Sequence, residues 1–253
     1  MPFTFAHPAI VLPLRKCKWF SFTALVFGSM APDFEYFFRM QPLSKFSHTF
    51  MGVLWFDLPL VILLSLLYHG VIKKPMIVYL PEWIGRGLSA GDPSTWQLRS
   101  WKSMLVFLYS GLLGSLTHIA WDAFTHKGAF FVNRVWLLQQ HISLGVMDVP
   151  VYKILQHGST GAGFAAIAFV IWNEGRARVS TVSAPPQVRA LEKWLFWSGI
   201  AAGGLLVACL YSLHAKGTLS ITEPLVHIVP FLSGCMATLI VLGWWLDKAR
   251  LKK

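Results

Sequence analysis

The chain has 253 residues, of which 55% are hydrophobic and only 13% are charged, and its mean hydropathy is +0.55. This composition is too apolar for an ordinary water-soluble domain of this length, so we expect a lipid bilayer to surround much of the chain. The net charge of +11 does not indicate nucleic-acid binding, because the basic residues are distributed over separate loops. The expected partners are membrane lipids.

Two short apolar pieces, residues 6–14 and 19–31, begin the chain on either side of a basic turn. We predict that the first piece is a short re-entrant helix that enters the membrane and that the second piece leads out of it again. His7 and Asp33 are then expected at the same depth in the membrane. The second piece also resembles a secretion signal with a small-residue cleavage site. Pro32 follows that site and disfavours cleavage, so the segment is expected to be retained.

Five later stretches are long enough to cross a membrane, since a span needs roughly 20 mostly apolar residues. They cover residues 50–72, 103–124, 150–173, 194–213 and 225–246. With 19–31, the pattern predicts an all-α fold: a polytopic membrane bundle of about six apolar helical segments plus the re-entrant helix. We interpret residues 1–253 as a single membrane domain, with the metal-site helices in 1–173 and a C-terminal helical pair in 190–253.

The distribution of basic residues predicts the topology of these helices. Lys and Arg are concentrated in 15–18, 73–102, 176–193 and 248–253, and these segments alternate with ones poorer in basic residues at 32–48, 125–149 and 214–224. The positive-inside rule places the basic turn and the C-terminal tail in the cytoplasm.

The decamer "THIAWDAFTH", residues 117–126, carries the strongest candidate site. On a helix, residues four apart lie on one face with about 5 to 6 Å between neighbouring Cβ atoms, so His118, Asp122 and His126 form one polar stripe. Two imidazoles and a carboxylate suit zinc, iron or manganese. The alternative is a hydrogen-bond cluster that only holds helices together.

Other ionisable residues are expected at the same membrane depth under this topology. Asp33 follows the first short run, His48 begins the next span from the same side, and His157 lies near the start of the span at 150–173. Ionisable residues within spans are costly and are functional candidates by default. Asp57 lies about 13 Å deeper than His48 at the helical rise, so it is not expected to share an ion with it.

Three blocks of the sequence resemble a known family. They are "GSMAPDFEYF", "SHTFMG" and "GSLTHIAWDAFTHKG". In this order they look like the conserved blocks of bacterial membrane-bound metal-dependent hydrolases, a group of inner-membrane proteins distantly similar to zinc-dependent phospholipase C. The resemblance covers roughly the first two thirds of the chain and implies a location in the bacterial inner membrane.

The resemblance also implies roles for individual residues. Asp33, His48, His118 and Asp122 fall on the presumed metal positions of that family, and His7 matches its N-terminal histidine. His126 occupies a position that is often not histidine in the wider family. The full candidate ligand set is His7, Asp33, His48, His118, Asp122, His126 and His157.

The expected function is metal-dependent hydrolysis of a phosphate ester or other ester of a lipid-like substrate at the non-cytoplasmic face. One or two divalent ions, with zinc as the first choice and iron or manganese as alternatives, would activate water and polarise the ester. Asp122 would be a ligand or a bridging group, and Glu35 would orient a histidine or act as a base, unless it is solvated. A metal or proton-coupled transporter and a structural protein with a polar packing cluster are the alternatives.

Overall fold

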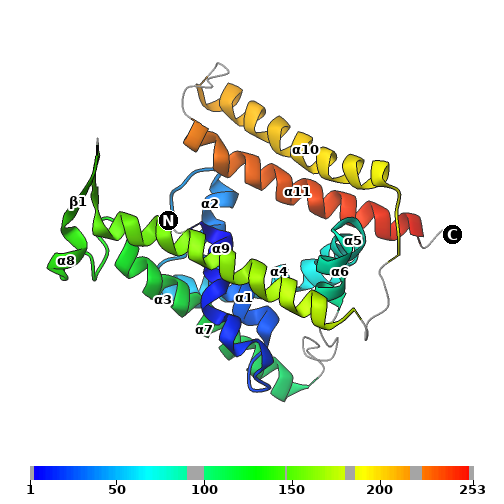
Figure 1. Cartoon of the computed structure of the whole chain (residues 1–253), viewed down its shortest axis with the longest axis horizontal. Helices are drawn as coiled ribbons and strands as arrows, with labels where there is room; N and C mark the ends of the chain where they lie inside the picture. The colour runs from blue at the N-terminus through cyan, green and yellow to red at the C-terminus, as the bar shows by residue number, and fades with distance from the viewer. Residues whose placement is uncertain (1–2, 90–99, 146, 180–185, 217–223, 251–253) are drawn as a thin grey trace. The chain divides into compact units, whose positions relative to one another are not determined.

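The structure, a computed structural model, describes residues 3–89, 100–145, 147–179, 186–216 and 224–250. Most of these residues are helical, and the strands form one short hairpin (Figure 1). The predicted all-α polytopic architecture is confirmed. In chain order the elements are η1 (Thr4–Lys16), α1 (Phe22–Met30), η2 (Ala31–Asp33), α2 (Phe34–Arg39), α3 (Phe50–Gly52), η3 (Val53–Asp57), α4 (Leu58–Leu67), η4 (Tyr68–Ile72), α5 (Lys73–Tyr79), α6 (Glu82–Ser89), α7 (Trp101–Thr125), α8 (Trp136–Gln139), β1 (His141–Leu144), β2 (Met147–Pro150), α9 (Val151–Ala177), α10 (Ala190–Lys216) and α11 (Pro224–Arg250).

Five helical stretches among the described residues are long and apolar enough to cross a membrane. They are Phe50–Tyr79, Trp101–Thr125, Val151–Ala177, Ala190–Ala215 and His227–Lys248. They coincide with the five stretches predicted from the sequence, and the first continues past residue 72 as α5.

The first span contains two π-helical turns, η3 and η4, and each precedes a proline. Pro59 and Pro75 lack an N–H group, and their rings would clash with the carbonyl four residues earlier in a regular α-helix. Those carbonyls belong to Trp55 and Val71, within the π turns. The wider turns therefore relieve a clash that would otherwise kink the span.

The two N-terminal pieces form short helices. The predicted re-entrant segment 6–14 lies within η1, a 3-10 helix, and α1 lies within 19–31. The nine residues of α1 span about 14 Å at the helical rise, roughly half of a bilayer's hydrocarbon core. Neither helix is long enough to cross a membrane alone.

The chain divides into two compact units. The first unit comprises Met1–Pro32, Phe46–Ile62 and Asp92–Val170. Within it, α1 packs closely on α7, because a Cβ atom added to Gly114 would lie 2.9 Å from the Cα of Gly28. Small residues allow membrane helices to approach at backbone distance. This approach brings the C-terminal end of α1 against the middle of α7.

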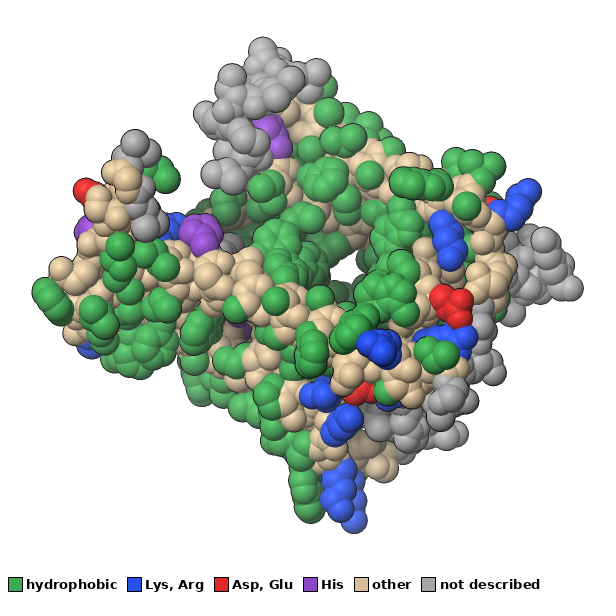
Figure 2. Space-filling view, viewed as in Figure 1, with side chains coloured by type: hydrophobic (Ala, Val, Ile, Leu, Met, Phe, Trp, Pro, Cys, Tyr) green, Lys and Arg blue, Asp and Glu red, His purple; other side chains and the backbone are tan. Residues whose placement is uncertain are grey.

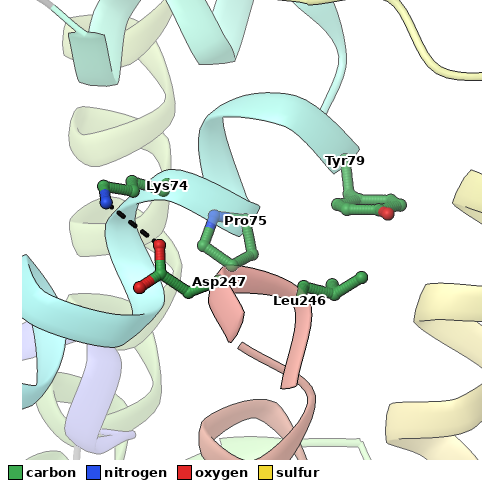
Figure 3. Close-up of a pocket in the computed structure, with 5 residues that line it drawn as sticks. All are labelled: Lys74, Pro75, Tyr79, Leu246 and Asp247. Carbon is green, nitrogen blue, oxygen red and sulfur yellow. Dashed lines mark hydrogen bonds and ion pairs between the residues drawn. The ribbon is translucent and has the colours of Figure 1, made fainter. Parts of the chain in front are cut away.

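The second unit comprises Asp33–Lys45, Leu63–Gly91 and Ile171–Lys253. Here α10 and α11 lie side by side, and hydrophobic side chains cover much of their visible surface (Figures 1 and 2). The Tyr79 ring stacks on Phe196 of α10 with centroids 4.4 Å apart. A small surface pocket lies where Lys74 pairs with Asp247 at 3.0 Å (Figure 3).

Candidate metal centre

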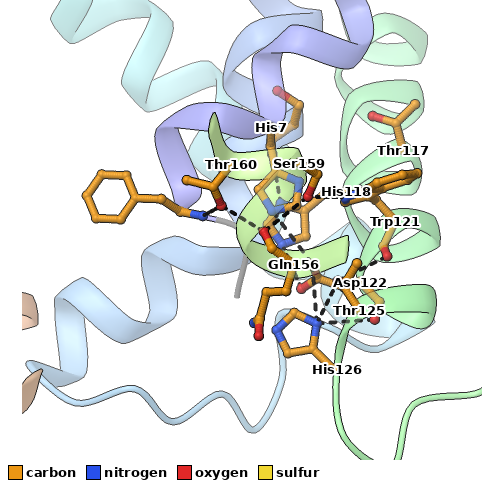
Figure 4. Close-up of polar contacts among 12 residues, drawn as sticks. His7, Thr117, His118, Trp121, Asp122, Thr125, His126, Gln156, Ser159 and Thr160 are labelled. Atoms are coloured by element: carbon orange, nitrogen blue, oxygen red, sulfur yellow. Dashed lines mark hydrogen bonds and ion pairs between the residues drawn. The ribbon is translucent and has the colours of Figure 1, made fainter. Parts of the chain in front are cut away.

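The centre is built on the C-terminal turns of α7. A capping box begins this helix, in which the Ser100 hydroxyl accepts from the Ser103 N–H, and the helix then runs without interruption to Thr125. His118 and Asp122 lie one turn apart and are both buried, and His126 follows as the C-cap residue. The helical spacing predicted from "THIAWDAFTH" thus places all three side chains around one point (Figure 4).

The proton on His118 is fixed by a neighbouring carbonyl. Its Nδ1 lies 2.8 Å from the backbone oxygen of Ser29, at the end of α1. A carbonyl oxygen only accepts hydrogen bonds, so Nδ1 carries the proton and donates it. In a neutral imidazole, Nε2 then presents a lone pair, which is the arrangement that metal-binding histidines commonly adopt.

Four histidine nitrogens surround the carboxylate of Asp122. The distances to its oxygens are 3.6 Å from Nε2 of His7, 3.7 Å from Nε2 of His48, 3.4 Å from Nε2 of His118 and 3.4 Å from Nδ1 of His126. Charge-assisted N–H···O bonds are shorter, about 2.7 to 2.9 Å. The four distances are longer than that range, and all four imidazoles face the same carboxylate.

The rings of His7 and His118 are stacked with centroids 3.7 Å apart and an interplanar angle of 21°. His7 is 5% exposed and His118 is 0% exposed. Two imidazolium ions at this separation would repel each other strongly in a buried site. The stacking therefore favours neutral rings. A divalent cation between them and Asp122 would be attracted by the carboxylate and would accept the Nε2 lone pair of His118.

The two oxygens of Asp122 face different histidines. Oδ2 faces His118 and His48, whereas Oδ1 faces His7 and His126. A carboxylate placed in this way can bind one ion through either oxygen or bridge two ions.

Asp33 supplies a second carboxylate. It ends η2, which continues directly from α1, so its position follows from the same helical turn as Ala31 and Pro32. Asp33 is fully buried, and one ligand atom from each of Asp33, His48, His118 and Asp122 lies within 4.8 Å of the others. This buried Asp/His/His/Asp group could hold a metal ion.

The spacing of these atoms fits a metal site. Ligand atoms about 2.0 to 2.2 Å from a tetrahedral zinc ion lie about 3.3 to 3.6 Å from one another. The Nε2···Oδ2 distances of 3.4 Å for His118 and 3.7 Å for His48 are close to that range. Nitrogen and carboxylate oxygen donors also suit zinc, iron and manganese.

The ligand role of His126 stays a prediction, and the structure shows which groups contact its ring. Its Nδ1 lies 3.1 Å from the backbone carbonyl of Asp122, so this nitrogen carries a proton and donates it. The nitrogen nearest the Asp122 carboxylate is therefore not the one with a lone pair. His126 is placed to orient Asp122, and its side chain is 28% exposed.

His157 is not brought to the centre. Its side chain is exposed on α9, whereas the preceding residue, Gln156, is 2% exposed. Consecutive residues on a helix point about 100° apart, so only one of the two can face inward. His157 therefore lies outside the four-residue ligand group, and its role as a ligand stays a prediction.

Gln156 is a further buried polar residue near the centre, and the sequence does not single it out. Figure 4 shows its side chain in view with His126 and Asp122, and its Oε1 forms no hydrogen bond within the described part of the chain. The helix that carries it is fixed against α7 by a hydrogen bond from the Trp121 indole to the Ser159 hydroxyl at 3.2 Å. A buried glutamine gives no distinctive sequence signal, because neither its spacing nor its charge sets it apart.

Glu35 and Asp57 are both buried but occupy other environments. The Oε1 atom of Glu35 accepts from Arg39 at 2.8 Å and from the Lys45 N–H at 3.0 Å. These contacts place Glu35 in an ion pair with Arg39, and its expected role as a base or orienting group stays a prediction. Asp57 lies within η3 and is not in the four-residue ligand group.

Comparisons with known proteins place the chain in a family. No curated protein and no solved structure matches the chain. The family model described as "Domain of unknown function (DUF4184)" matches residues 1–244, and it names no hydrolase. Since this match covers far more than half of the sequence, the chain belongs to the DUF4184 family.

Proposed function

We propose that the protein is a membrane-embedded metal-dependent hydrolase. One observation carries the proposal: the Nε2 atoms of His7, His48 and His118 converge on the Asp122 carboxylate at 3.4 to 3.7 Å. Imidazole nitrogens gathered around one buried carboxylate form a donor set that suits a divalent ion. The bacterial membrane-bound hydrolases that the sequence resembles support the same reading.

The protein groups would each contribute a defined part. His118, His48, Asp33 and Asp122 would hold a divalent ion, with zinc as the first ion to test. When bound, the ion supplies Lewis-acid chemistry by lowering the pKa of a water and polarising a phosphoryl or acyl oxygen. The Ser29 carbonyl keeps His118 in the tautomer that can bind, and His126 orients Asp122.

The substrate class follows from the proposed location. The positive-inside rule places the C-terminal end of α7, and with it the centre, near the non-cytoplasmic face of a bacterial inner membrane. A phosphate ester or other ester of an amphiphilic molecule reaches that depth with its apolar part still in lipid. The candidate substrates are therefore membrane lipids or lipid-linked phosphates.

Metal analysis of detergent-purified protein tests the centre. We expect stoichiometric metal in the wild type and in His157→Ala, whose exposed histidine is the matched control. His118→Ala and Asp122→Ala should bind metal on the order of 100-fold more weakly, because each removes a ligand. Equal metal content in all four proteins would contradict the proposed site.

Hydrolysis is tested separately on a panel of phospholipids and lipid-linked phosphates in mixed micelles. We expect release of phosphate or headgroup that stops with a chelator and returns when metal is added. A protein that binds metal but releases no product from any member of the panel would contradict hydrolysis and leave the centre intact.

The second candidate is a metal or proton-coupled transporter. The observation that favours it is Asp57, which is 0% exposed within the same candidate span that follows His48. Buried carboxylates within spans often serve proton or ion relays. Metal or proton uptake into proteoliposomes that is lost in Asp57→Asn, without any ester hydrolysis, would favour this function.

A further inference from the structure

The residues between α7 and α9 form a separate surface beside the centre. α7 ends at Thr125 and α9 begins at Val151, and both helices are candidate membrane spans. If both cross the bilayer, the connecting residues 126–150 lie at one membrane face. Figure 1 shows α8 and the hairpin of β1 and β2 beyond the start of α9. We call residues 128–150 the interfacial segment.

Large apolar side chains of the interfacial segment are exposed. They are Phe130 at 56%, Trp136 at 73%, Leu137 at 60%, Ile142 at 46% and Met147 at 63%. Exposed apolar groups gathered in one short segment mark a contact surface, whereas single ones are common on any protein. Trp in particular is enriched at membrane–water boundaries.

The hairpin is amphipathic. Its register pairs Ile142 with Val149 and Ser143 with Asp148, and the turn passes through Gly145 at φ 73°. Side chains alternate along a strand, so Ile142, Val149 and Met147 share one face while Ser143 and Asp148 share the other. A two-stranded hairpin of this size is marginally stable alone, so its apolar face needs a cover.

Several backbone carbonyls in the described part of the segment accept hydrogen bonds from its own side chains. The Asn133 side chain donates to the Gly128 carbonyl at 2.8 Å, and Gln139 donates to the Val132 carbonyl at 2.9 Å. The Arg134 guanidinium lies 3.7 Å from the centre of the Phe130 ring and donates to the Phe130 carbonyl at 3.2 Å. Carbonyls that are bonded within the protein suit the boundary between lipid headgroups and acyl chains.

We propose that the interfacial segment inserts its apolar face into the headgroup and acyl-chain boundary of the leaflet nearest the metal centre. Lipid is the occupant that the surface favours, because the segment is continuous with two lipid-facing spans and combines Trp, aliphatic and basic side chains. The segment would anchor the end of α7 at the depth from which an amphiphilic substrate enters. The inference requires α7 and α9 to span, but it does not require hydrolysis.

Site-specific fluorescence in nanodiscs holding one protein copy each tests this inference. The native Cys17, Cys209 and Cys235 are replaced by serine, and an environment-sensitive fluorophore is attached to single cysteines in Ile142→Cys or Met147→Cys. Ser143→Cys is the matched control, since it lies in the same strand on the opposite face. The probes are nitroxide-labelled phospholipids and aqueous iodide.

We expect the fluorophores at 142 and 147 to be quenched by the nitroxide lipids and to be several-fold less sensitive to iodide than the one at 143. Equal sensitivity to iodide at all three positions would overturn the inference. Protection from both quenchers would also overturn it, because protein would then cover the face. Since neither metal nor substrate enters the measurement, its outcome is independent of the proposed hydrolysis.

Discussion

At the scale of single residues, the centre depends on which imidazole nitrogen holds the proton. The Ser29 carbonyl fixes Nδ1 of His118 as a donor at 2.8 Å, and the Asp122 carbonyl does the same for Nδ1 of His126 at 3.1 Å. The first histidine thus directs a lone pair toward the Asp122 carboxylate, and the second donates its proton to the Asp122 backbone carbonyl. Two histidines of the same helix therefore serve as a ligand and as an orienting group.

Gln156→Leu separates a role in the site from a role in packing. A buried polar atom without a hydrogen bond costs about 1 to 3 kcal/mol, so a leucine of similar volume should leave the thermal unfolding midpoint unchanged or raise it. If the amide serves the substrate, hydrolysis should fall while metal content is unchanged. Thermal unfolding, metal content and product release are measured on the same preparation. Unchanged hydrolysis would show that Gln156 does not contribute to the reaction.

The sequence predicted some site residues better than others for a physical reason. His118, Asp122 and His126 belong to one helix, so their spacing alone fixes their common face. The choice between Gln156 and His157 depends on the rotation of α9 about its axis. The polar residues of that helix do not gather on one side, so its sequence contains no periodicity from which the inward face can be read.

At the scale of elements, glycines determine whether the centre can assemble. A Cβ atom on Gly114 would lie 2.5 Å from the Leu25 carbonyl oxygen and 2.8 Å from the Ser29 nitrogen. These contacts belong to the backbone of α1, which cannot move aside without separating the two helices. The hydrogen bond between Ser29 and His118 depends on the same close approach.

Gly114→Leu should therefore lower the thermal unfolding midpoint and weaken metal binding together. Gly158→Ala on α9 is the control, because a Cβ atom there would meet nothing within 4 Å. That change should be neutral or stabilising by up to about 1 kcal/mol, since alanine favours helices over glycine. Metal titration and thermal unfolding of both variants provide the check. Wild-type metal affinity in Gly114→Leu would contradict the role of this contact.

The spans were predictable because a run of about 20 apolar residues can adopt few structures other than a membrane-spanning helix. The hairpin at 141–150 was not, because strands of four residues are too short for alternation to stand out in a sequence. The short helices η1 and α1 were located by their apolar runs, but the 3-10 geometry of η1 was not foreseen.

At the scale of the whole molecule, the proposed topology requires the two ends of α9 to lie on opposite sides of the membrane. Lys127 precedes the interfacial segment, and Arg189 lies in the basic connector before α10. The positive-inside rule assigns Arg189 to the cytoplasm and Lys127 to the other side.

Cysteine labelling in intact cells tests this arrangement. In a background without the native cysteines, Lys127→Cys should react with a membrane-impermeant maleimide, and Arg189→Cys should react only after permeabilisation. Both positions are exposed, so access to solvent does not by itself distinguish them. Labelling of Arg189→Cys in intact cells would indicate the opposite topology, in which the centre lies near the cytoplasmic face.

Anomalous X-ray scattering at the zinc edge, from crystals of the protein grown with zinc, tests the proposed metal centre most directly. We expect a peak about 2.0 to 2.2 Å from Nε2 of His118 and from a carboxylate oxygen of Asp122, with His48 and Asp33 as the remaining ligands. Ordered density for these four side chains without an anomalous peak among them would contradict the proposed centre.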